Sequence, residues 1–220
     1  MAMDKTTRTL LALLLGGIAL APAWAAAPDG KQIATQGLGG VPCLACHGDR
    51  GQGSDAAGFP RLAGMDAGYL ASQLHAFKDG TRQNPVMAPQ VQGLDDAAIA
   101  AVAAYYAGLP VPEPTPGPGN SDLLEQGRIL ATRGRWADDI PACEQCHGPG
   151  GRGIPPHFPA LAAQHAGYLE SQIRAWQQGQ RHNDPNGLMA AVAERLGEDD
   201  IKAVAAWFAS QAATPAPAKP

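Results

Sequence analysis

The sequence predicts an all-α protein built from two similar domains, and three observations support this prediction. A set of residues in the first half recurs about a hundred positions later in the second half. A proline-rich stretch separates the two copies. Both copies contain apolar stripes at helical spacing, and neither contains a convincing run of β-strand residues.

The first 25 residues have the features of a signal peptide. Lys5 and Arg8 give a positive start, an apolar run covers residues 10–20, and Ala25 ends an Ala-x-Ala-like sequence of small residues. The apolar run is short for a membrane span. We therefore expect cleavage near Ala25 and export to the periplasm.

The charge of the chain argues against nucleic acid as a partner. The formal net charge is -4, and removal of the leader, with one acidic and two basic residues, makes it -5. Lys and Arg are scattered along the remaining sequence and form no basic cluster. The mature protein is therefore expected to be mildly acidic and to bind no nucleic acid.

A linker at residues 111–120 divides the chain. Proline stands there at alternate positions, in Val-Pro-Glu-Pro-Thr-Pro-Gly-Pro, which blocks helices and favours an extended, semi-rigid spacer. We place the first domain at residues 26–110 and the second at 121–213, with a disordered tail at 214–220. Each domain then has fewer than about a hundred residues, a common size for a small domain.

Each domain is expected to contain three helices joined by long glycine-rich loops. The apolar spacing, acidic starts and terminal glycines place these helices at residues 31–36, 69–77 and 95–107 in the first domain, and at 122–132, 168–176 and 198–210 in the second. Three helices make a small core for a domain of this size. A bound apolar group would enlarge that core.

Each domain also carries two cysteines three positions apart with a histidine directly after the second. The motifs are Cys43-Leu44-Ala45-Cys46-His47 and Cys143-Glu144-Gln145-Cys146-His147. This spacing attaches a c-type haem, because the two thiols add to the two vinyl groups of one porphyrin and the histidine becomes the proximal iron ligand. The sequence therefore predicts two covalently bound haem c groups, on which each domain depends to fold.

Three other uses of the cysteines fit the motifs less well. Structural disulfides would not require a histidine after each pair. A zinc site shared by both pairs is disfavoured by the long separation between them. A thioredoxin-like redox pair would need an α/β context, which the sequence lacks.

Met87 and Met189 are the candidates for the second axial ligand of each iron. They correspond in the repeat and lie 40 and 42 residues after their histidines, in stretches that we expect to be irregular. Met65, the other methionine beyond the leader, is replaced by Gln164 in the second domain. Methionine commonly fills gaps in cores, but the repeated pairing with a haem histidine favours the iron-ligand role here.

This combination of motifs resembles the di-haem cytochrome c4 family. The resemblance rests on Cys-x-x-Cys-His-Gly, Phe-Pro-Arg-Leu-Ala-Gly at residues 59–64, Tyr-Leu-x-x-Gln-Leu at 69–74, and Gly-x-Arg ahead of a lone methionine. It implies two tandem class I cytochrome c domains, each a few helices around one haem, with haem propionates near the interface between them. It also implies that Pro60 and Pro159 present carbonyl groups to the haem histidines. Arg61, replaced by Ala160 in the repeat, is a candidate contact of a propionate.

The predicted function is that of an electron carrier in a respiratory chain rather than an enzyme. Histidine and methionine would fill both axial positions of each iron, which raises the potential and leaves no site for substrate. The expected partners are a terminal oxidase and an upstream donor, such as a cytochrome bc complex or a dehydrogenase, and peripheral association with a membrane stays open.

Two alternatives to a free carrier remain. The chain could be the cytochrome subunit of a periplasmic dehydrogenase complex, which would use the same haem chemistry with a fixed partner. A di-haem enzyme such as a peroxidase would instead need one iron with an available position. A thiosulfate-oxidising cytochrome with a cysteine-ligated haem would need a fifth cysteine, and the sequence contains four.

Overall fold

The structure, a computed structural model, describes residues 28–114 and 121–213. The predicted signal peptide, the second part of the linker and the predicted tail lie outside these ranges. Within them the chain forms helices and turns, and only isolated β-bridges occur. The predicted all-α class is therefore confirmed. None of the helices described in these ranges has the length and apolar character needed to cross a membrane.

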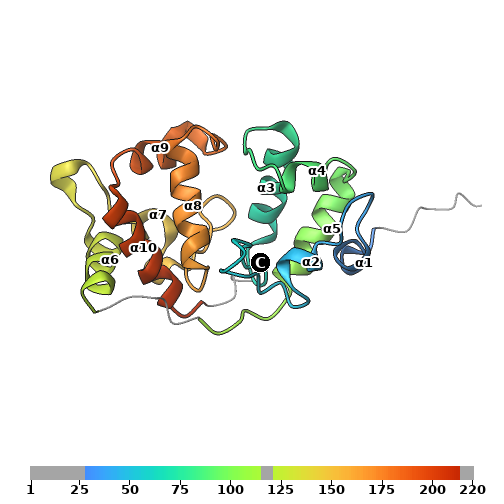
Figure 1. The fold of residues 1–220 in the computed structure, drawn as a ribbon, viewed down its shortest axis with the longest axis horizontal. Helices are drawn as coiled ribbons and strands as arrows, with labels where there is room; N and C mark the ends of the chain where they lie inside the picture. Colours follow the sequence, from blue (N-terminus) through green and yellow to red (C-terminus); the bar gives the residue numbers. More distant parts are fainter. Residues whose placement is uncertain (1–27, 115–120, 214–220) are drawn as a thin grey trace, which may run out of the picture.

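The helices form two bodies that lie side by side (Figure 1). The first body contains α1 (Gly30–Gln36), α2 (Leu44–His47), α3 (Ala67–Asp79), α4 (Met87–Val91) and α5 (Asp96–Ala107). The second contains α6 (Ser121–Arg133), α7 (Glu144–His147), α8 (Ala166–Gln177), α9 (Leu188–Ala193) and α10 (Glu198–Ser210), with short 3-10 turns at Trp136–Asp138, Pro149–Gly151 and Pro185–Gly187. The six predicted helices are all present, to within about three residues at each end.

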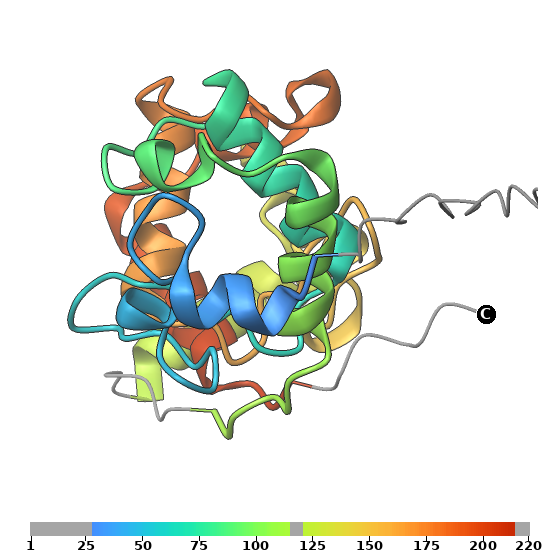
Figure 2. The same cartoon turned by 90° about the vertical axis from the view of Figure 1, so that its right-hand side faces the viewer.

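In each body the first and last helices cross at very close range, at a glycine. A Cβ atom on Gly30 would lie 2.0 Å from the carbonyl oxygen of Ala101, and one on Gly127 would lie 2.1 Å from that of Ala203. Only glycine therefore permits the crossing of α1 with α5 and of α6 with α10. A third long helix lies between these two in the sequence, α3 in the first body and α8 in the second. In the first body the three helices surround the centre, as the end-on view shows (Figure 2).

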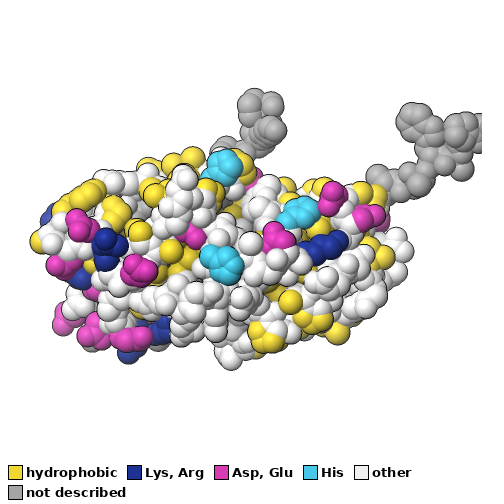
Figure 3. Space-filling model, turned by 90° about the horizontal axis from the view of Figure 1, so that it is seen from above, with side chains coloured by type: hydrophobic (Ala, Val, Ile, Leu, Met, Phe, Trp, Pro, Cys, Tyr) yellow, Lys and Arg dark blue, Asp and Glu magenta, His cyan; other side chains and the backbone are white. Residues whose placement is uncertain are grey.

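The core of the first body forms where α3 and α5 pack together. Leu70 and Phe77 of α3 are buried against Ile99 and Val102 of α5. The second body has smaller clusters, in which Ile201 and Phe208 of α10 are almost fully buried. Acidic side chains gather over the end of the molecule formed by this second body (Figure 3).

The two bodies meet through the turns that follow α3 and α8. The backbone N–H of Gln83 donates to the carbonyl of Gln180 at 2.8 Å, and that of His182 donates to Thr81 at 2.9 Å. These bonds form a short antiparallel bridge between Arg82 and the corresponding Arg181. The repeated residues thus meet each other across an approximately two-fold contact.

Candidate haem sites

The histidine of each Cys-x-x-Cys-His motif is buried and held by a proline carbonyl. Nδ1 of His47 lies 3.0 Å from the carbonyl oxygen of Pro60, and Nδ1 of His147 lies 2.9 Å from that of Pro159. A carbonyl only accepts hydrogen bonds, so Nδ1 carries the proton and Nε2 is left with a free lone pair. Such a fixed ring is suited to binding a metal through Nε2.

Burial also keeps these histidines in the form that binds a metal. Removal from water lowers the pKa of both His47 and His147, although the hydrogen bonds to Pro60 and Pro159 act in the opposite direction. Neutral imidazole is therefore favoured at neutral pH. The rings of Phe59 and Phe158 lie 6.2 Å from the histidine rings, centroid to centroid, at equivalent positions in the two sites.

Each motif folds as a single helical turn, which the sequence pattern did not reveal. In the first site the N–H of His47 donates to the carbonyl of Cys43 at 3.0 Å, and Gly48, with φ of 80°, ends the turn. The same bond, at 2.9 Å, connects His147 with Cys143. A four-residue helix is too short to show an apolar period, so α2 and α7 had no detectable signal.

No disulfide joins any of the four cysteines. Burial raises the pKa of Cys43 and raises that of Cys143 to about 12, so these thiols are protonated when they are not bonded to a haem. The described residues contain no group of three or more His, Cys, Asp or Glu side chains suited to one metal ion. The two motifs are thus separate sites, each with two thiols and one oriented imidazole, and this donor set fits one covalently bound haem.

Two buried polar atoms further indicate a bound group. Among the described residues, the hydroxyl of Tyr106 and the indole Nε1 of Trp207 are buried without a hydrogen-bond partner. They lie near the ends of α5 and α10, the corresponding last helices of the two bodies. Because unpaired buried donors are costly, each fits a site in which a cofactor supplies an acceptor.

Met87 and Met189 lie at the starts of short helices, so the expectation of irregular stretches was wrong. Met87 is the first residue of α4 and Met189 the second of α9. A side-chain oxygen of Asn84 accepts hydrogen bonds from the N–H groups of Val86 and Met87, both at 2.9 Å. In the same way, a side-chain oxygen of Asp184 accepts a hydrogen bond from the N–H of Met189 at 2.9 Å.

The signal for these helices was the Asn-Pro and Asp-Pro pairs, which commonly begin turns. Met65, which does not repeat, is 4% exposed and belongs to the core of the first body. Met87 is only partly buried against that core. This contrast agrees with a packing role for Met65, while the iron-ligand role of Met87 and Met189 stays a prediction.

Arg61 is a buried contact between the two bodies. Its guanidinium donates to the carbonyls of Ala163 at 3.1 Å and Ala162 at 3.0 Å in the second body, and to the nearby Ala63. Burial lowers the pKa of Arg61 to about 10. Gln164 completes the contact, exchanging hydrogen bonds of 2.8 and 2.9 Å with the backbone of Arg61. The contact of Arg61 with a propionate stays a prediction.

The chain is similar to known cytochromes c over both of its domains. The family model for cytochrome c matches twice, at residues 27–109 and 137–212. The thiosulfate dehydrogenase electron acceptor of Thiomonas intermedia is 44% identical over 94% of this chain and 93% of its own length. Cytochrome c4 of Thiocapsa roseopersicina is 39% identical over 84% of this chain and 95% of its own.

A solved structure has the same fold. The thiosulfate dehydrogenase TsdBA from Marichromatium purpuratum matches with a TM-score of 0.77 and 44% identity, over 83% of this chain. This chain spans only 39% of the length of that protein. The match therefore concerns one part of a larger chain.

Proposed function

Because this chain belongs to the di-haem cytochrome c4 family, with the cytochrome c domain present twice, we propose that it carries electrons from a thiosulfate-oxidising dehydrogenase to a respiratory acceptor. The protein is a di-haem electron carrier, and each bound haem supplies one-electron chemistry between ferrous and ferric iron. The donor and the acceptor are the proposed parts of this function. The domain boundaries at residues 26–110 and 121–213 also stay proposals.

The observation that carries the proposal is the duplication of a site with two thiols and one oriented imidazole. We assign Cys43 and Cys46, and Cys143 and Cys146, as the residues that hold the haems through thioether bonds. His47 and His147 would occupy one axial position of each iron, and Met87 and Met189 the other. With both positions filled by the chain, no iron would be open to substrate.

The proposed donor follows from the name of one relative. The protein from Thiomonas intermedia, which is described as the electron acceptor of a thiosulfate dehydrogenase, matches nearly the full length of both chains. The present chain has four cysteines, all placed in the haem motifs. None remains to ligate an iron through sulfur, so we assign thiosulfate oxidation to a separate enzyme and electron transfer to this chain. We place the exchange in the periplasm and propose no nucleic-acid partner.

Reduction kinetics test this function directly. The haem-loaded protein is mixed with a purified thiosulfate dehydrogenase, with and without thiosulfate, and the haem absorption is followed in a stopped-flow instrument. We expect rapid reduction of both haems only when enzyme and thiosulfate are both present. Slow reduction, together with rapid reduction by a cytochrome bc complex, would refute the proposed donor while leaving the carrier function intact.

Binding of carbon monoxide tests the closed sites separately. Ferrous protein with both axial positions filled should bind no carbon monoxide at neutral pH. A carbon monoxide complex at one haem would instead support the alternative of a di-haem enzyme with an open iron. Intact mass measured on the same sample should exceed that of the apoprotein by two haems.

A further inference from the structure

The segment ahead of each candidate methionine ligand differs in charge between the two bodies. In the first body the side-chain oxygen of Asn84 accepts a hydrogen bond from the N–H of Met87 at 2.9 Å. In the second body one carboxylate oxygen of Asp184 accepts from the N–H of Met189 at 2.9 Å and from that of the next residue at 3.1 Å. Each acceptor directly precedes a proline. The two positions are therefore equivalent in their contacts, and a neutral amide in the first body is replaced by a carboxylate in the second.

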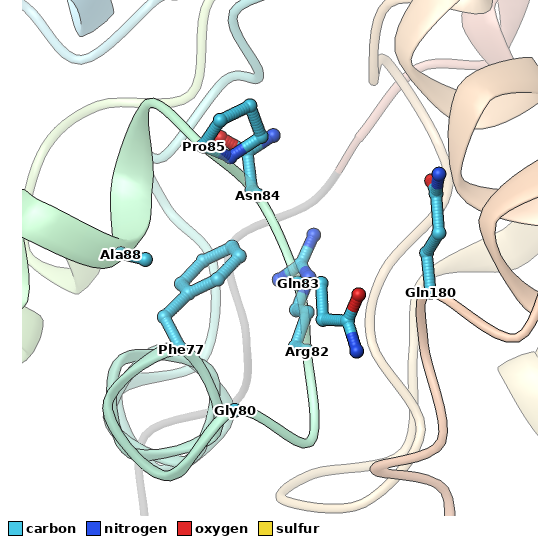
Figure 4. A pocket seen from close by; sticks show the side chains of 8 residues that line it. All are labelled: Phe77, Gly80, Arg82, Gln83, Asn84, Pro85, Ala88 and Gln180. Carbon is cyan, nitrogen blue, oxygen red and sulfur yellow. The ribbon is translucent and has the colours of Figure 1, made fainter.

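Asp184 is held by a third donor that the first body lacks. Its other carboxylate oxygen accepts a hydrogen bond from the indole Nε1 of Trp176 at 3.0 Å. Phe77 occupies the position of Trp176 in the repeat, and a phenyl ring has no hydrogen-bond donor. Phe77 and Asn84 instead line a common cavity of about 430 Å³ (Figure 4). The difference in charge is thus accompanied by a matching difference in the aromatic residue beside it.

Asp184 carries a formal negative charge, and no ion pair among the described residues includes it. Its partners are N–H groups, which orient a carboxylate and stabilise its charge without cancelling it. The residue is partly buried, whereas Asn84 is exposed. Solvent therefore screens the charge of Asp184 less than it would screen a charge at the surface.

One buried arginine lies beside each of the two aromatic rings. The guanidinium carbon of Arg181 is 3.9 Å from the ring centroid of Trp176, and that of Arg82 is 4.5 Å from the ring centroid of Phe77. The same positive charge therefore occurs in each body. It leaves the difference in negative charge between the two segments in place.

A negative charge near a haem iron favours the ferric state and so lowers the reduction potential. Asp184 is one hydrogen bond from the backbone of Met189, the proposed axial ligand of the second iron. From this arrangement we propose that Asp184 is a positioning residue that lowers the reduction potential of the second haem relative to that of the first. The inference rests on the proposed function, because that function assigns Met189 to the iron.

The charge of Asp184 also affects where a single electron resides in the half-reduced protein. Transfer between the two sites converts one ferrous and one ferric haem into one ferric and one ferrous haem, so it needs no other reactant. The electron favours the site with the higher potential. Asp184 therefore shifts the distribution of this electron toward the first haem, and its removal shifts the distribution toward the second.

The test is a redox titration of the haem-loaded protein, followed by visible and far-red spectra, with Asp184→Asn and Asn84→Asp. Asp184→Asn keeps an oxygen acceptor for Met189 but removes the charge. The equilibrium constant for reduction of the second haem should rise about five- to tenfold, where tenfold is about 59 mV for one electron. Asn84→Asp adds a charge at an exposed position and should lower the step of the first haem by about two- to threefold. The methionine-to-iron absorption should remain in both variants.

Met189→His, which replaces the proposed ligand, identifies the step that belongs to the second haem. Asp199→Asn is the matched control for charge, because Asp199 is an exposed residue of the same body, on α10. Its substitution should change either step by less than about twofold. If Asp184→Asn moves neither step, moves the step of the first haem, or shifts the second no more than Asp199→Asn does, the proposed role of Asp184 is refuted.

Asp184→Ala separates the charge from the hydrogen bonds, because it removes both. It should raise the step of the second haem at least as much as Asp184→Asn does. A shift in Asp184→Ala that is absent from Asp184→Asn would also refute the role of the charge. Asn84→Asp provides the same test if Asp184→Asn does not fold. A wild-type protein that lacks two haems by mass, or lacks the methionine-to-iron absorption, would refute the proposed function instead.

Discussion

The two contacts between the domains differ in symmetry. Arg82 and Arg181 come from the repeated Gly-x-Arg sequence, and each bonds the tyrosine and glutamine of the opposite domain. Arg61 has no counterpart in the second domain, and it reaches in one direction only, to the carbonyls of Ala162 and Ala163. Repeated residues therefore determine what the two haem sites share, and residues that do not repeat determine where they can differ.

The strongest test of the shared features is the pair Met87→His and Met189→His. Replacing a thioether ligand with imidazole favours ferric iron, so each variant should remain low-spin and lose potential at one haem. Because axial ligands span about 0.8 V in haem proteins, we expect a fall on the order of 200 mV in one step. A redox titration with visible spectra measures both steps.

Met65→Ala is the control for that pair, because Met65 lies in the core of the first domain. It should lower stability and leave the far-red methionine-to-iron absorption of the ferric protein in place. Loss of that band in Met65→Ala, with the band retained in Met87→His, would show that the ligand of the first haem is assigned wrongly.

The one-sided contact is tested by Arg61→Ala. The substitution leaves three buried carbonyls without their donor, and hydrogen bonds to charged groups contribute about 1.5–3 kcal/mol each before relaxation. We expect a loss of about 3 kcal/mol in the free energy of unfolding, measured with guanidinium. Removing the positive charge should also lower mainly the potential of the first domain's haem.

Arg50→Ala is the matched control for Arg61, because its side chain is 81% exposed. Surface substitutions of this kind change stability by about 0.5 kcal/mol or less. If Arg61→Ala behaved like Arg50→Ala, the buried contact would not stabilise the interface. If Arg61→Ala changed only the reduction potential of the second domain's haem, Arg61 would have no effect on the potential of the first.

The sequence predicted well those features that have a local pattern. The repeat, the haem motifs and the six longer helices were visible because each has a fixed spacing or an apolar period. The four short helices lacked such a period, and in two of them Asn84 or Asp184 accepts a hydrogen bond from the backbone N–H of Met87 or Met189. The role of Arg61 could not be predicted, because its partners are carbonyl groups about a hundred residues away, and any residue supplies a carbonyl.

A smaller difference between the domains concerns Gly64 and Ala163. They occupy corresponding turns, and their N–H groups donate to Tyr106 and Phe208, both at 3.0 Å. Both have positive φ, 68° for Gly64 and 51° for Ala163. A Cβ on Gly64 would lie 2.2 Å from a methyl carbon of Val111, whereas Ala163 already carries a Cβ.

Exchanging these residues should therefore have unequal effects. In Gly64→Ala, the left-handed backbone conformation costs a non-glycine residue about 1–2 kcal/mol. The new Cβ would also clash with Val111, whose side chain must move. We therefore expect the free energy of unfolding to fall by about 2 kcal/mol. Ala163→Gly removes the cost of the left-handed backbone conformation at this position. Glycine also has more conformational entropy in the unfolded state, which acts in the opposite direction, so the free energy of unfolding should change by less than about 0.5 kcal/mol. Denaturant unfolding of both variants measures this, and equal losses would contradict the comparison.

The smallest expected effect concerns an ion pair that, among the described residues, occurs in the second domain and not in the first. Arg135 donates to both carboxylate oxygens of Asp200, each at 2.8 Å. Alanine replaces Asp200 at the corresponding position 98 of the first domain. The hydrogen bonds from Arg135 hold the pKa of Asp200 below its usual range. A lowered pKa in the folded state means that the pair stabilises the fold above the unfolded pKa of about 3.9.

That stability is lost as the pH falls through the lowered pKa of Asp200. Because Arg135 is 41% exposed, solvent screening limits the contribution to below about 1 kcal/mol. Asp200→Asn should therefore be less stable than wild type by up to this amount at pH 7, and the difference should shrink as the pH falls below the unfolded pKa of about 3.9. Arg135→Gln and the double variant should show the same loss at pH 7, because removing either partner removes the pair. Unfolding profiles of Asp200→Asn and wild type that stayed parallel throughout the acid range would contradict a role for this pair in the acid sensitivity of the second domain.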